Sequence, residues 1–418
     1  MRSRLKILIT GLAIGATLLT ASIAPARILI ASGMTAIRQM VLAGRMEGAV
    51  RLLKSDYDLK TPGGLHALRD FSLFVLRQGL NDADSFERCY AATALAAHDD
   101  WSGRPIIVQA LNSPNLLIQK AALEGLAQAN NGEALRILEN FYRLSSPISR
   151  TIAIQAIAQV RTPAVMPLLL QATRDPNSSG AFWAVNGLGR MGDRDALPYL
   201  QRLLAKSIDP MMRTEAAHSM ILLGDRTPID TLEVGLASAE SDVAAEAALA
   251  LGDARDPAAV DLLKEVMASE RAAAQVRLAA AVALTHYGNP EGLPMLQRAL
   301  DDERNRNDIY IISMLDHLDF AVGRSLIVDA TRSGSQEIRL TAYEIIGRSG
   351  GDPEVGLLSN ALRQTGDQTE RAQIAWSLAR IGRPASIPVL LEAIQDPTPE
   401  IRDTAAEGLA QVADKALQ

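Results

Sequence analysis

Two histidines and an aspartate are the residues best placed to do chemistry, because they recur in one register. His286 and His317 fall at the same position of consecutive copies of a repeated pattern, Asp253 holds that position one copy earlier, and Asp316 adjoins His317. On repeated helices, the two histidines would lie on neighbours whose axes are about 10 Å apart. A shared metal ion needs its ligand atoms at about 2.1 Å, so both side chains would have to lean together. A metal site, ordinary surface histidines and a contact with a partner all stay open at this point.

Other signatures of catalysis or cofactor binding are weak. The glycines of NGLGRMGD (186–193) follow no predicted strand, so they do not form a phosphate-binding loop. The only cysteine, Cys89, allows neither a disulfide within one chain nor a thiolate metal cluster. We therefore assign no catalytic, cofactor-binding or metal-ligating residue, and expect a protein that is not an enzyme and uses no cofactor.

The composition of the 418-residue chain favours layers of helices over a large globular core. Aromatic residues make up only 4% of the chain, whereas hydrophobic residues as a class make up 48%. Small and aliphatic side chains let helices pack closely without bulky aromatic anchors. The net charge of −6 gives no general attraction for nucleic acid, which binds basic surfaces. We therefore expect no nucleic-acid partner.

Residues 1–26 have the character of an export segment. Arg2, Arg4 and Lys6 precede a run without charge from Ile7 to Ala26, and Ala24-Pro25-Ala26 has the small-x-small form of a cleavage site. The run is also long enough, at roughly 30 Å as a helix, to be an uncleaved membrane anchor. Because the basic residues stay inside, either alternative places the rest of the chain outside the cytoplasm.

One pattern repeats along most of the chain at a nearly constant interval. Its reference positions are 88, 119, 150, 181, 213, 244, 277, 308, 339, 371 and 402. The residue three positions on (+3) is alanine except for Ile311 and Ile374, and the residues at +7 and +19 are nearly all leucine or isoleucine. A period in the thirties predicts a solenoid of stacked units.

Each unit predicts two helices. Positions −1, +3, +4 and +7 share one helical face, and alanine at +3 lets a neighbouring helix approach closely. Glycines at +11 predict left-handed ends of the first helix: Gly192, Gly224, Gly288, Gly350 and Gly382. Prolines at +17 predict the first turn of the second helix: Pro105, Pro167, Pro198, Pro294 and Pro388.

The segments IRDTAAEGLA (401–410), VRLAAAVALTHYG (276–288) and SIPVLLEAIQDPTPEIR (386–402) resemble HEAT repeats. The unit is most similar to the HEAT-like repeats named after phycobilisome lyases, and the resemblance covers about 65–414. It implies that the helix beginning at the reference position lines the concave side. The early arginine of that helix in HEAT repeats is matched by Arg88, Arg150, Arg213, Arg277, Arg339, Arg371 and Arg402.

Two enzyme families share this architecture, and neither fits the sequence well. Deoxyhypusine hydroxylases bind iron through His-Glu pairs on successive repeats, and this chain has no His-Glu dipeptide. Phycobilin lyases attach a pigment to cytoplasmic antenna proteins, which an export segment argues against.

The organisation that follows has three parts. Residues 1–26 are a signal peptide or anchor, residues 27–64 form a helical N-terminal cap, and residues 65–418 form an all-α solenoid of about eleven HEAT-like two-helix repeats. The sequence TPGG (61–64) is the predicted junction. Because the chain stops soon after the last concave helix, we expect its own polar residues or a partner to mask that end.

The concave face is the candidate binding surface, because positions +2, +5 and +9 point away from the packing seam. The candidate residues for contact with a partner are Trp183, Arg190, His218, Tyr310, His317, Arg348, Trp376 and Arg380. Tryptophan and arginine are common anchors of protein interfaces, and two arginines beside an indole suit an acidic or aromatic peptide. We expect a non-catalytic scaffold or assembly factor that binds a protein or peptide outside the cytoplasm. The alternative is a lyase-like or metal-dependent HEAT-repeat enzyme.

Overall fold

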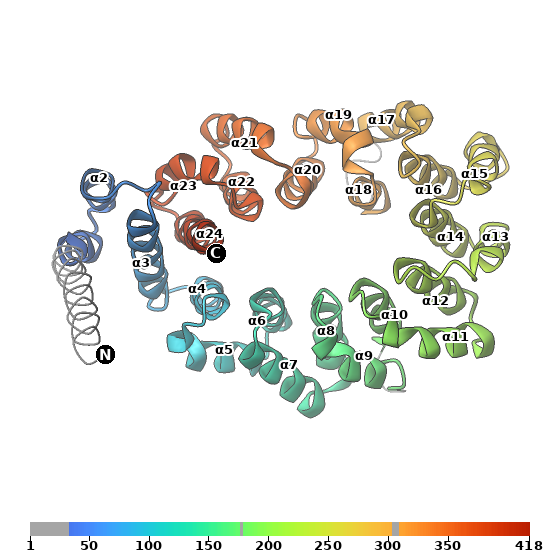
Figure 1. The fold of residues 1–418 in the computed structure, drawn as a ribbon, viewed down its shortest axis with the longest axis horizontal. Coiled ribbons are helices and arrows are strands. Elements are labelled where there is room, and N and C mark those ends of the chain that lie inside the picture. The colour runs from blue at the N-terminus through green and yellow to red at the C-terminus, as the bar shows by residue number, and fades with distance from the viewer. Residues whose placement is uncertain (1–32, 176–178, 303–308) are drawn as a thin grey trace, which may run out of the picture.

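The computed structural model describes residues 33–175, 179–302 and 309–418, apart from the side chains of residues 309–311. Every regular element in these ranges is a helix, and the helices follow one another as stacked pairs (Figure 1), so the predicted all-α solenoid is confirmed. No helix in the described ranges is long and apolar enough to cross a membrane. The segment 1–26, predicted to be a signal peptide or anchor, lies outside the described residues.

The paired helices form two layers, one lining the inside of a ring and one covering its outside (Figure 1). The inner layer contains α4 (Ser85–Ala97), α6 (Leu116–Ala129), α8 (Pro147–Ile157), α10 (Ala181–Arg190), α12 (Pro210–Leu222), α14 (Ser241–Ala254), α16 (Ala274–Thr285), α18 (Ile309–Asp316), α20 (Gln336–Ser349), α22 (Gln368–Ile381) and α24 (Pro399–Leu417). The outer layer contains α5 (Arg104–Leu111), α7 (Gly132–Leu144), α9 (Met166–Ala172), α11 (Leu197–Lys206), α13 (Ile229–Leu236), α15 (Ala259–Ala268), α17 (Leu293–Asp301), α19 (Phe320–Ala330), α21 (Asp352–Gln364) and α23 (Ile387–Ala393). The inner layer is therefore the predicted concave side.

Local sequence signals set the starts of these helices. Polar side chains cap several inner helices by accepting hydrogen bonds from backbone N–H groups of the first turn; they are Asp84, Asn115, Ser146, Asp209, Ser335 and Asp367. A proline occupies the first turn of α5, α9, α11, α17 and α23, as the sequence predicts. These signals recur in register, so they fix the alternation of the two layers.

The predicted glycine turns are confirmed at four of their five positions. Values of φ between 62° and 81°, which favour glycine, occur at Gly192, Gly224, Gly288 and Gly382. Gly350 differs, because its φ is −77°. The chain leaves α20 in an extended conformation there, and the Gly351 N–H donates to Glu354 Oε2 at 2.7 Å to begin the next helix. That turn therefore needs no left-handed residue.

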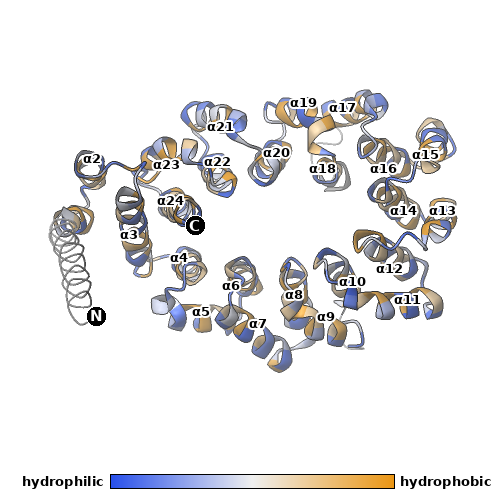
Figure 2. Cartoon of the chain, in the orientation of Figure 1, coloured by the Kyte–Doolittle hydropathy of each residue, from blue (hydrophilic) through white to orange (hydrophobic). Residues whose placement is uncertain are grey.

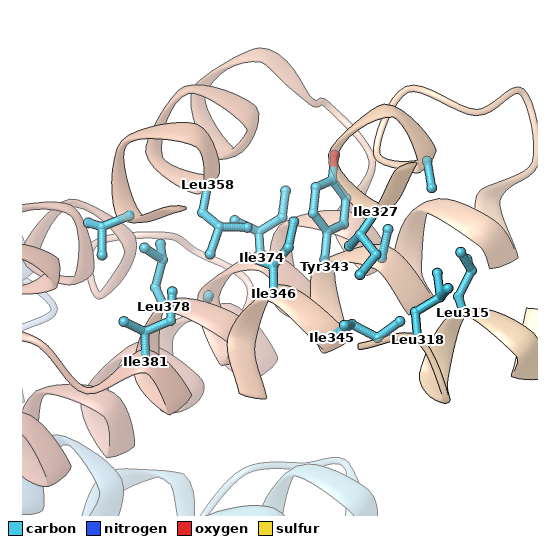
Figure 3. Packing of buried hydrophobic residues seen from close by; sticks show 14 of the residues in the cluster. Leu315, Leu318, Ile327, Tyr343, Ile345, Ile346, Leu358, Ile374, Leu378 and Ile381 are labelled. Carbon is cyan, nitrogen blue, oxygen red and sulfur yellow. The ribbon is translucent and has the colours of Figure 1, made fainter. Parts of the chain in front are cut away.

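The alanines at +3 form the seam between neighbouring inner helices. Each one is fully buried: Ala91, Ala122, Ala153, Ala184, Ala216, Ala247, Ala280, Ala342 and Ala405. The backbones approach so closely that a Cβ on Gly252 of α14 would lie 2.8 Å from the Cα of Ala283 on α16. Larger aliphatic residues fill the space between the layers, as Leu358, Ile374 and Ile346 show in Figure 3. Apolar residues occur in both layers all around the ring (Figure 2).

The solenoid closes on itself, which the sequence did not predict. The last inner helix, α24, packs along α3 (Pro62–Gly79) and also contacts α4. The carboxylate of Asp414 joins the two ends, because it accepts from Arg69 Nε and lies against His98 Nδ1, each at 2.6 Å. Tyr90 of α4 also donates a hydrogen bond to Glu407 of α24. The C-terminal face is therefore covered by the chain's own N-terminal helices, in what we call the closing seam.

The residues before α3 are helical as well. A helix covers residues 33–42, and α2 spans Met46–Asp56. The predicted junction TPGG is the start of α3, because the Thr61 side chain accepts from the N–H of Gly64 at 3.2 Å and so caps the helix.

Candidate metal centre on the inner face of the ring

A compact group of acidic and imidazole side chains lies on two adjacent inner helices. Glu215 and His218 are one turn apart on α12, and Glu246 lies on α14. One ligand atom from each of these three residues lies within 4.8 Å of those of the other two. All three occupy the inner-face positions +2 and +5 of their units, so the repeat itself brings them together. We call Glu215, His218 and Glu246 the Glu–His–Glu group.

Hydrogen bonds hold the His218 ring between two carboxylates. Its Nδ1 lies 2.6 Å from Glu246 Oε1, and its Nε2 lies 2.8 Å from Oδ2 of Asp253, one helix along on α14. A carboxylate behind a histidine fixes the ring's orientation and tautomer, and this arrangement is common behind metal-binding histidines. Asp253 therefore orients His218 so that Nδ1 faces the two glutamates.

A second histidine continues the chain of hydrogen bonds along the inner face. His286 directs Nδ1 to Asp253 Oδ1 at 2.9 Å and donates from Nε2 to the backbone carbonyl of His317 at 2.7 Å. Because both partners are acceptors, these contacts favour the protonated form of His286. Burial lowers its pKa, but the hydrogen bonds to Asp253 and to the carbonyl outweigh burial and raise the pKa of His286 above its usual value. The contacts link α12, α14, α16 and the residue after α18.

Glu215 is the least satisfied member of the group. Its side chain is almost completely buried, with 1% relative exposure. Its Oε1 accepts from Asn186 Nδ2 at 3.1 Å, whereas Oε2 has no hydrogen-bond partner among the described residues. Burial, assisted by the charge of Glu246, raises the pKa of Glu215 to about 8. An unpartnered buried carboxylate oxygen is costly unless a proton or a cation neutralises it.

Either protons or a divalent cation can offset the negative charge of the carboxylates in the Glu–His–Glu group. Burial opposes the charged ring of His218, but hydrogen bonds to Asp253 and Glu246 raise the pKa of His218 well above its usual value. Without a cation, the protons on Glu215 and His218 therefore offset the carboxylates. A divalent cation in place of those two protons would leave the total charge unchanged. Two carboxylates and one imidazole are ligands that first-row divalent metals accept.

The predicted pair of histidines does not converge on one ion. The His286 ring meets the backbone of His317 rather than its imidazole, and the side chain of His317 is exposed to solvent. His286 therefore supports the site through Asp253, and His317 contributes its carbonyl.

The predicted partner-binding residues lie on the inner layer but divide into separate places. His218 belongs to the Glu–His–Glu group, and Arg190 lies near it, within the electrostatic reach of Glu215 and Asp253. Trp183 is 37% exposed and packs edge-on against Phe182, with ring centroids 5.6 Å apart. The side chain of Tyr310 lies outside the described part of the chain.

The three C-terminal members of the predicted patch are engaged with one another or with acids. The Arg380 guanidinium lies 5.6 Å from the centre of the Trp376 ring, one turn away on α22. Arg348 forms an ion pair with Asp316 and lies 3.9 Å from Glu344. The Trp376 ring therefore supports an arginine, which leaves less of it for a peptide than the sequence suggested.

Glu215 and Glu246 are the functional candidates that sequence reasoning missed. Both occupy +2, a position that the repeat assigns to the concave face, and Glu215 forms Glu-x-x-His with His218. That spacing places both side chains on one face of a helix and could have identified them. A different motif gives a false signal, because GRSGG (347–351) matches a nucleophile-elbow pattern but ends helix α20 and follows no strand.

Comparisons with known proteins agree on the repeat. A family model described as HEAT repeats matches residues 74–147, 141–221, 229–313 and 355–418. Deoxyhypusine hydroxylase-B of Oryza sativa subsp. japonica is 36% identical over 95 residues, which cover 22% of this chain and 32% of that protein. The chain thus matches about a third of the length of this curated relative.

Two solved structures are similar to part of this chain. Human deoxyhypusine hydroxylase in complex with glycerol is 21% identical, with 62% of this chain and 99% of that chain covered and a TM-score of 0.30. The complex of CpcE and CpcF of phycocyanin lyase from Nostoc sp. PCC7120 is 20% identical, with 61% and 94% covered and a TM-score of 0.34. Superpositions this loose support no conclusion about function.

The comparisons correct one expectation from the sequence. The chain was expected not to be an enzyme, yet the curated relative that it matches is a hydroxylase. The sequence argument looked for His-Glu dipeptides, whereas the structure brings His218 together with Glu246 and Asp253, which lie 28 and 35 residues away in the sequence.

Proposed function

The chain belongs to the HEAT-repeat family, and on that scaffold we propose a metal-dependent enzyme whose centre is the Glu–His–Glu group on the inner face of the ring. The observation that carries this proposal is the convergence of three ligand atoms within 4.8 Å of one another, around a buried Glu215 oxygen that has no hydrogen-bond partner among the described residues. The match to an enzyme of the same repeat class supports it.

Each residue of the site has a distinct role in this proposal. Glu215, His218 and Glu246 would hold the cation, and three protein ligands would leave positions for a substrate or water. Asp253 orients His218 through Nε2, and the His286 imidazolium offsets the charge of Asp253. When bound, a divalent cation polarises a substrate oxygen or lowers the pKa of a bound water.

The test is direct measurement of metal binding. Chelator-treated protein is titrated with Zn²⁺, Mn²⁺ and, under anaerobic conditions, Fe²⁺ by isothermal titration calorimetry. We expect one ion per chain for at least one metal, with binding abolished in Glu215→Gln and His218→Ala. Glu124→Gln is the matched control, because Glu124 is an exposed acid on inner helix α6. Equal binding by His218→Ala and the wild-type protein would refute the proposed centre.

Binding of a protein partner is a second candidate function, and an apolar rim favours it. Leu117, Leu144, Ile148 and Ile208 are 64% to 97% exposed. They lie at or beside the connections from an outer helix to the next inner helix. These connections are all on the same edge of the ring. Exposed aliphatic side chains along one edge suit contact with another protein. Double substitution of Leu144 and Ile148 by Lys should reduce recovery of co-purifying proteins, and unchanged recovery would remove the rim from consideration.

The location outside the cytoplasm is also part of the proposal and rests on residues 1–26 alone. Mass spectrometry of the chain purified from its source cells tests the cleaved alternative, because cleavage after Ala26 makes Arg27 the first residue. An intact N-terminus in a membrane fraction indicates the anchored alternative, whereas an intact N-terminus in the cytoplasm contradicts both.

A further inference from the structure

Four arginines lie on or directly after inner helices, and one of them, Arg190, interacts with Glu215 of the Glu–His–Glu group. Arg190, Arg348 and Arg380 each occupy position +9 of their unit, and Arg161 follows inner helix α8. Figure 1 shows α20 and α22, which carry Arg348 and Arg380, on the side of the ring opposite α8 and α10. The helices that carry or precede these arginines therefore lie on both sides of the ring.

These guanidinium groups are close enough to repel one another. Desolvation and then the charges of Arg190, Arg380 and Arg161 lower the pKa of Arg348 below its usual value. Desolvation and then the charge of Arg161 likewise lower the pKa of Arg190. In a chain whose net charge is −6, such a concentration of like charge costs free energy unless an anion offsets it.

Acids in the neighbourhood offset only part of this charge. Arg348 is paired with Asp316, and Glu344 lies 3.9 Å away. Burial raises the pKa of Glu344, against the opposing charge of Arg380. Lys415 of α24 lies near Arg380 and Arg383 and adds further positive charge to the same region. The charge of Glu124 also acts on Glu344, and the charges of Glu215 and Asp253 act on Arg190, so acids and arginines are interleaved here.

The arginines are also held in place. Arg380 lies against the Trp376 ring, with its guanidinium carbon 5.6 Å from the ring centre, and Arg348 is held by Asp316. A planar, preorganised guanidinium can donate two parallel hydrogen bonds to an oxyanion with little further loss of conformational freedom.

We propose that Arg161, Arg190, Arg348 and Arg380 form an anion-binding site that holds the phosphate or carboxylate groups of a small polyanionic substrate beside the Glu–His–Glu group. This inference rests on the proposed function, because Arg190 links the two places through its interaction with Glu215 and Asp253. Convergent charges suit a compact anion. A small polyanion therefore fits better than the acidic peptide suggested by the sequence.

The experiment measures anion binding separately from metal binding. Chelator-treated protein is titrated by calorimetry at fixed ionic strength with inorganic tripolyphosphate, with citrate and with hexaglutamate. Tripolyphosphate and citrate distinguish phosphate from carboxylate chemistry, and hexaglutamate represents an acidic peptide. We expect tripolyphosphate or citrate to bind at one site per chain, and Arg348→Ala and Arg380→Ala each to weaken binding by about tenfold.

The controls make each outcome decisive. Arg202→Ala, on outer helix α11, should bind as the wild-type protein does, and Arg348→Lys should recover part of the lost affinity because it keeps the charge. Melting curves show whether each variant is folded. Absence of binding by both small anions, equal binding by the alanine variants, or binding of hexaglutamate alone would overturn the inference. Anion binding by a protein that binds no metal would leave the anion site standing and refute the metal centre.

Discussion

Two of the places where the ring buries carboxylates differ in which groups lie beside the acids. On α12 and α14, Glu215 and Glu246 lie next to the His218 ring, and the carboxylates and imidazoles alternate. At the closing seam, Asp403 of α24 is fully buried. Its Oδ1 accepts from Arg402 Nε at 2.8 Å, and its Oδ2 has no hydrogen-bond partner among the described residues. The first place offers several ligands for a cation, whereas the second offers no imidazole beside its acid.

The difference shows when a buried acid becomes a site. Burial raises the pKa of Asp403 to about 6, and burial with the charges of Glu400 and Asp403 raises the pKa of Glu87 to about 7. At the closing seam, the negative charge of Asp403 and Glu87 is removed by protonation. The stability of the closing seam therefore depends on pH. In the Glu–His–Glu group, an oriented imidazole adds a nitrogen ligand. A bound metal ion can therefore offset the charge of the carboxylates in place of protons.

The largest expected effect concerns the packing of α16 against its neighbouring inner helices. Ala280 of α16 is fully buried, and the backbones of α14 and α16 approach closely at Gly252 and Ala283. Ala280→Leu should lower the free energy of unfolding by roughly 1–3 kcal/mol through overpacking. Urea denaturation measures the change, with Ala273→Leu at the exposed start of α16 as the control. A variant as stable as the wild-type protein would show that the assigned packing register is wrong.

The next prediction separates the two acidic places by metal affinity. Asp253→Asn should weaken metal binding by about 10- to 100-fold although Asp253 is not a ligand, because the amide no longer fixes the His218 tautomer. Asp403→Asn should leave metal affinity unchanged. Each variant is titrated by calorimetry with the metal that the wild-type protein binds, and the metal affinities are compared. If the two substitutions weakened binding equally, the distinction between site and seam would fail.

A smaller effect is expected from the pH dependence of the seam. Because the folded pKa of Asp403 is raised from its usual 3.8 to about 6, the seam is most stable below about pH 4 and loses stability as pH rises through 6. Asp403→Asn cannot ionise, so it should gain roughly 1–2 kcal/mol over the wild-type protein at pH 8 and little at pH 4. Unfolding at both pH values measures this, and a gain that is the same at both would contradict the assignment.

The smallest effect concerns the polar contacts that join the chain ends. Asp414→Asn removes the charge that pairs with Arg69 and His98. Because the Arg69 and Asp414 side chains are about 30% exposed, the loss should be about 1 kcal/mol or less. Thermal melting at low and high salt measures it, with Glu139→Gln on outer helix α7 as the control for an exposed pair. A loss that salt leaves unchanged would mean that packing, rather than charge, is responsible.

Much of the fold follows from the sequence because the repeat is local. The alanine at +3, the glycine at +11 and the proline at +17 act within one unit, so each copy confirms the others. Closure of the ring was not predictable in this way. It joins α3, which lies before the first reference position, to α24 in the last unit, through contacts such as Arg69–Asp414 that no period encodes.

The candidate site was predictable in part for the same reason. The repeat places His218 and His317 on the inner face, but it does not determine side-chain direction. His286 meets a backbone carbonyl, and His218 meets carboxylates on the next helix, because of rotamers and small offsets between neighbouring units. Glu215 and Glu246 share the inner-face position +2, so a search by position rather than by dipeptide would have identified them.

One measurement tests the central claim most directly: anomalous diffraction from crystals of the protein loaded with Zn²⁺, recorded above and below the zinc absorption edge. The account predicts a single strong anomalous peak bounded by Glu215, His218 and Glu246, at about 2.0–2.2 Å from their ligand atoms, with Asp253 still bonded to His218 Nε2. A peak only at other residues, or no peak while His218 stays bonded to Glu246, would contradict it.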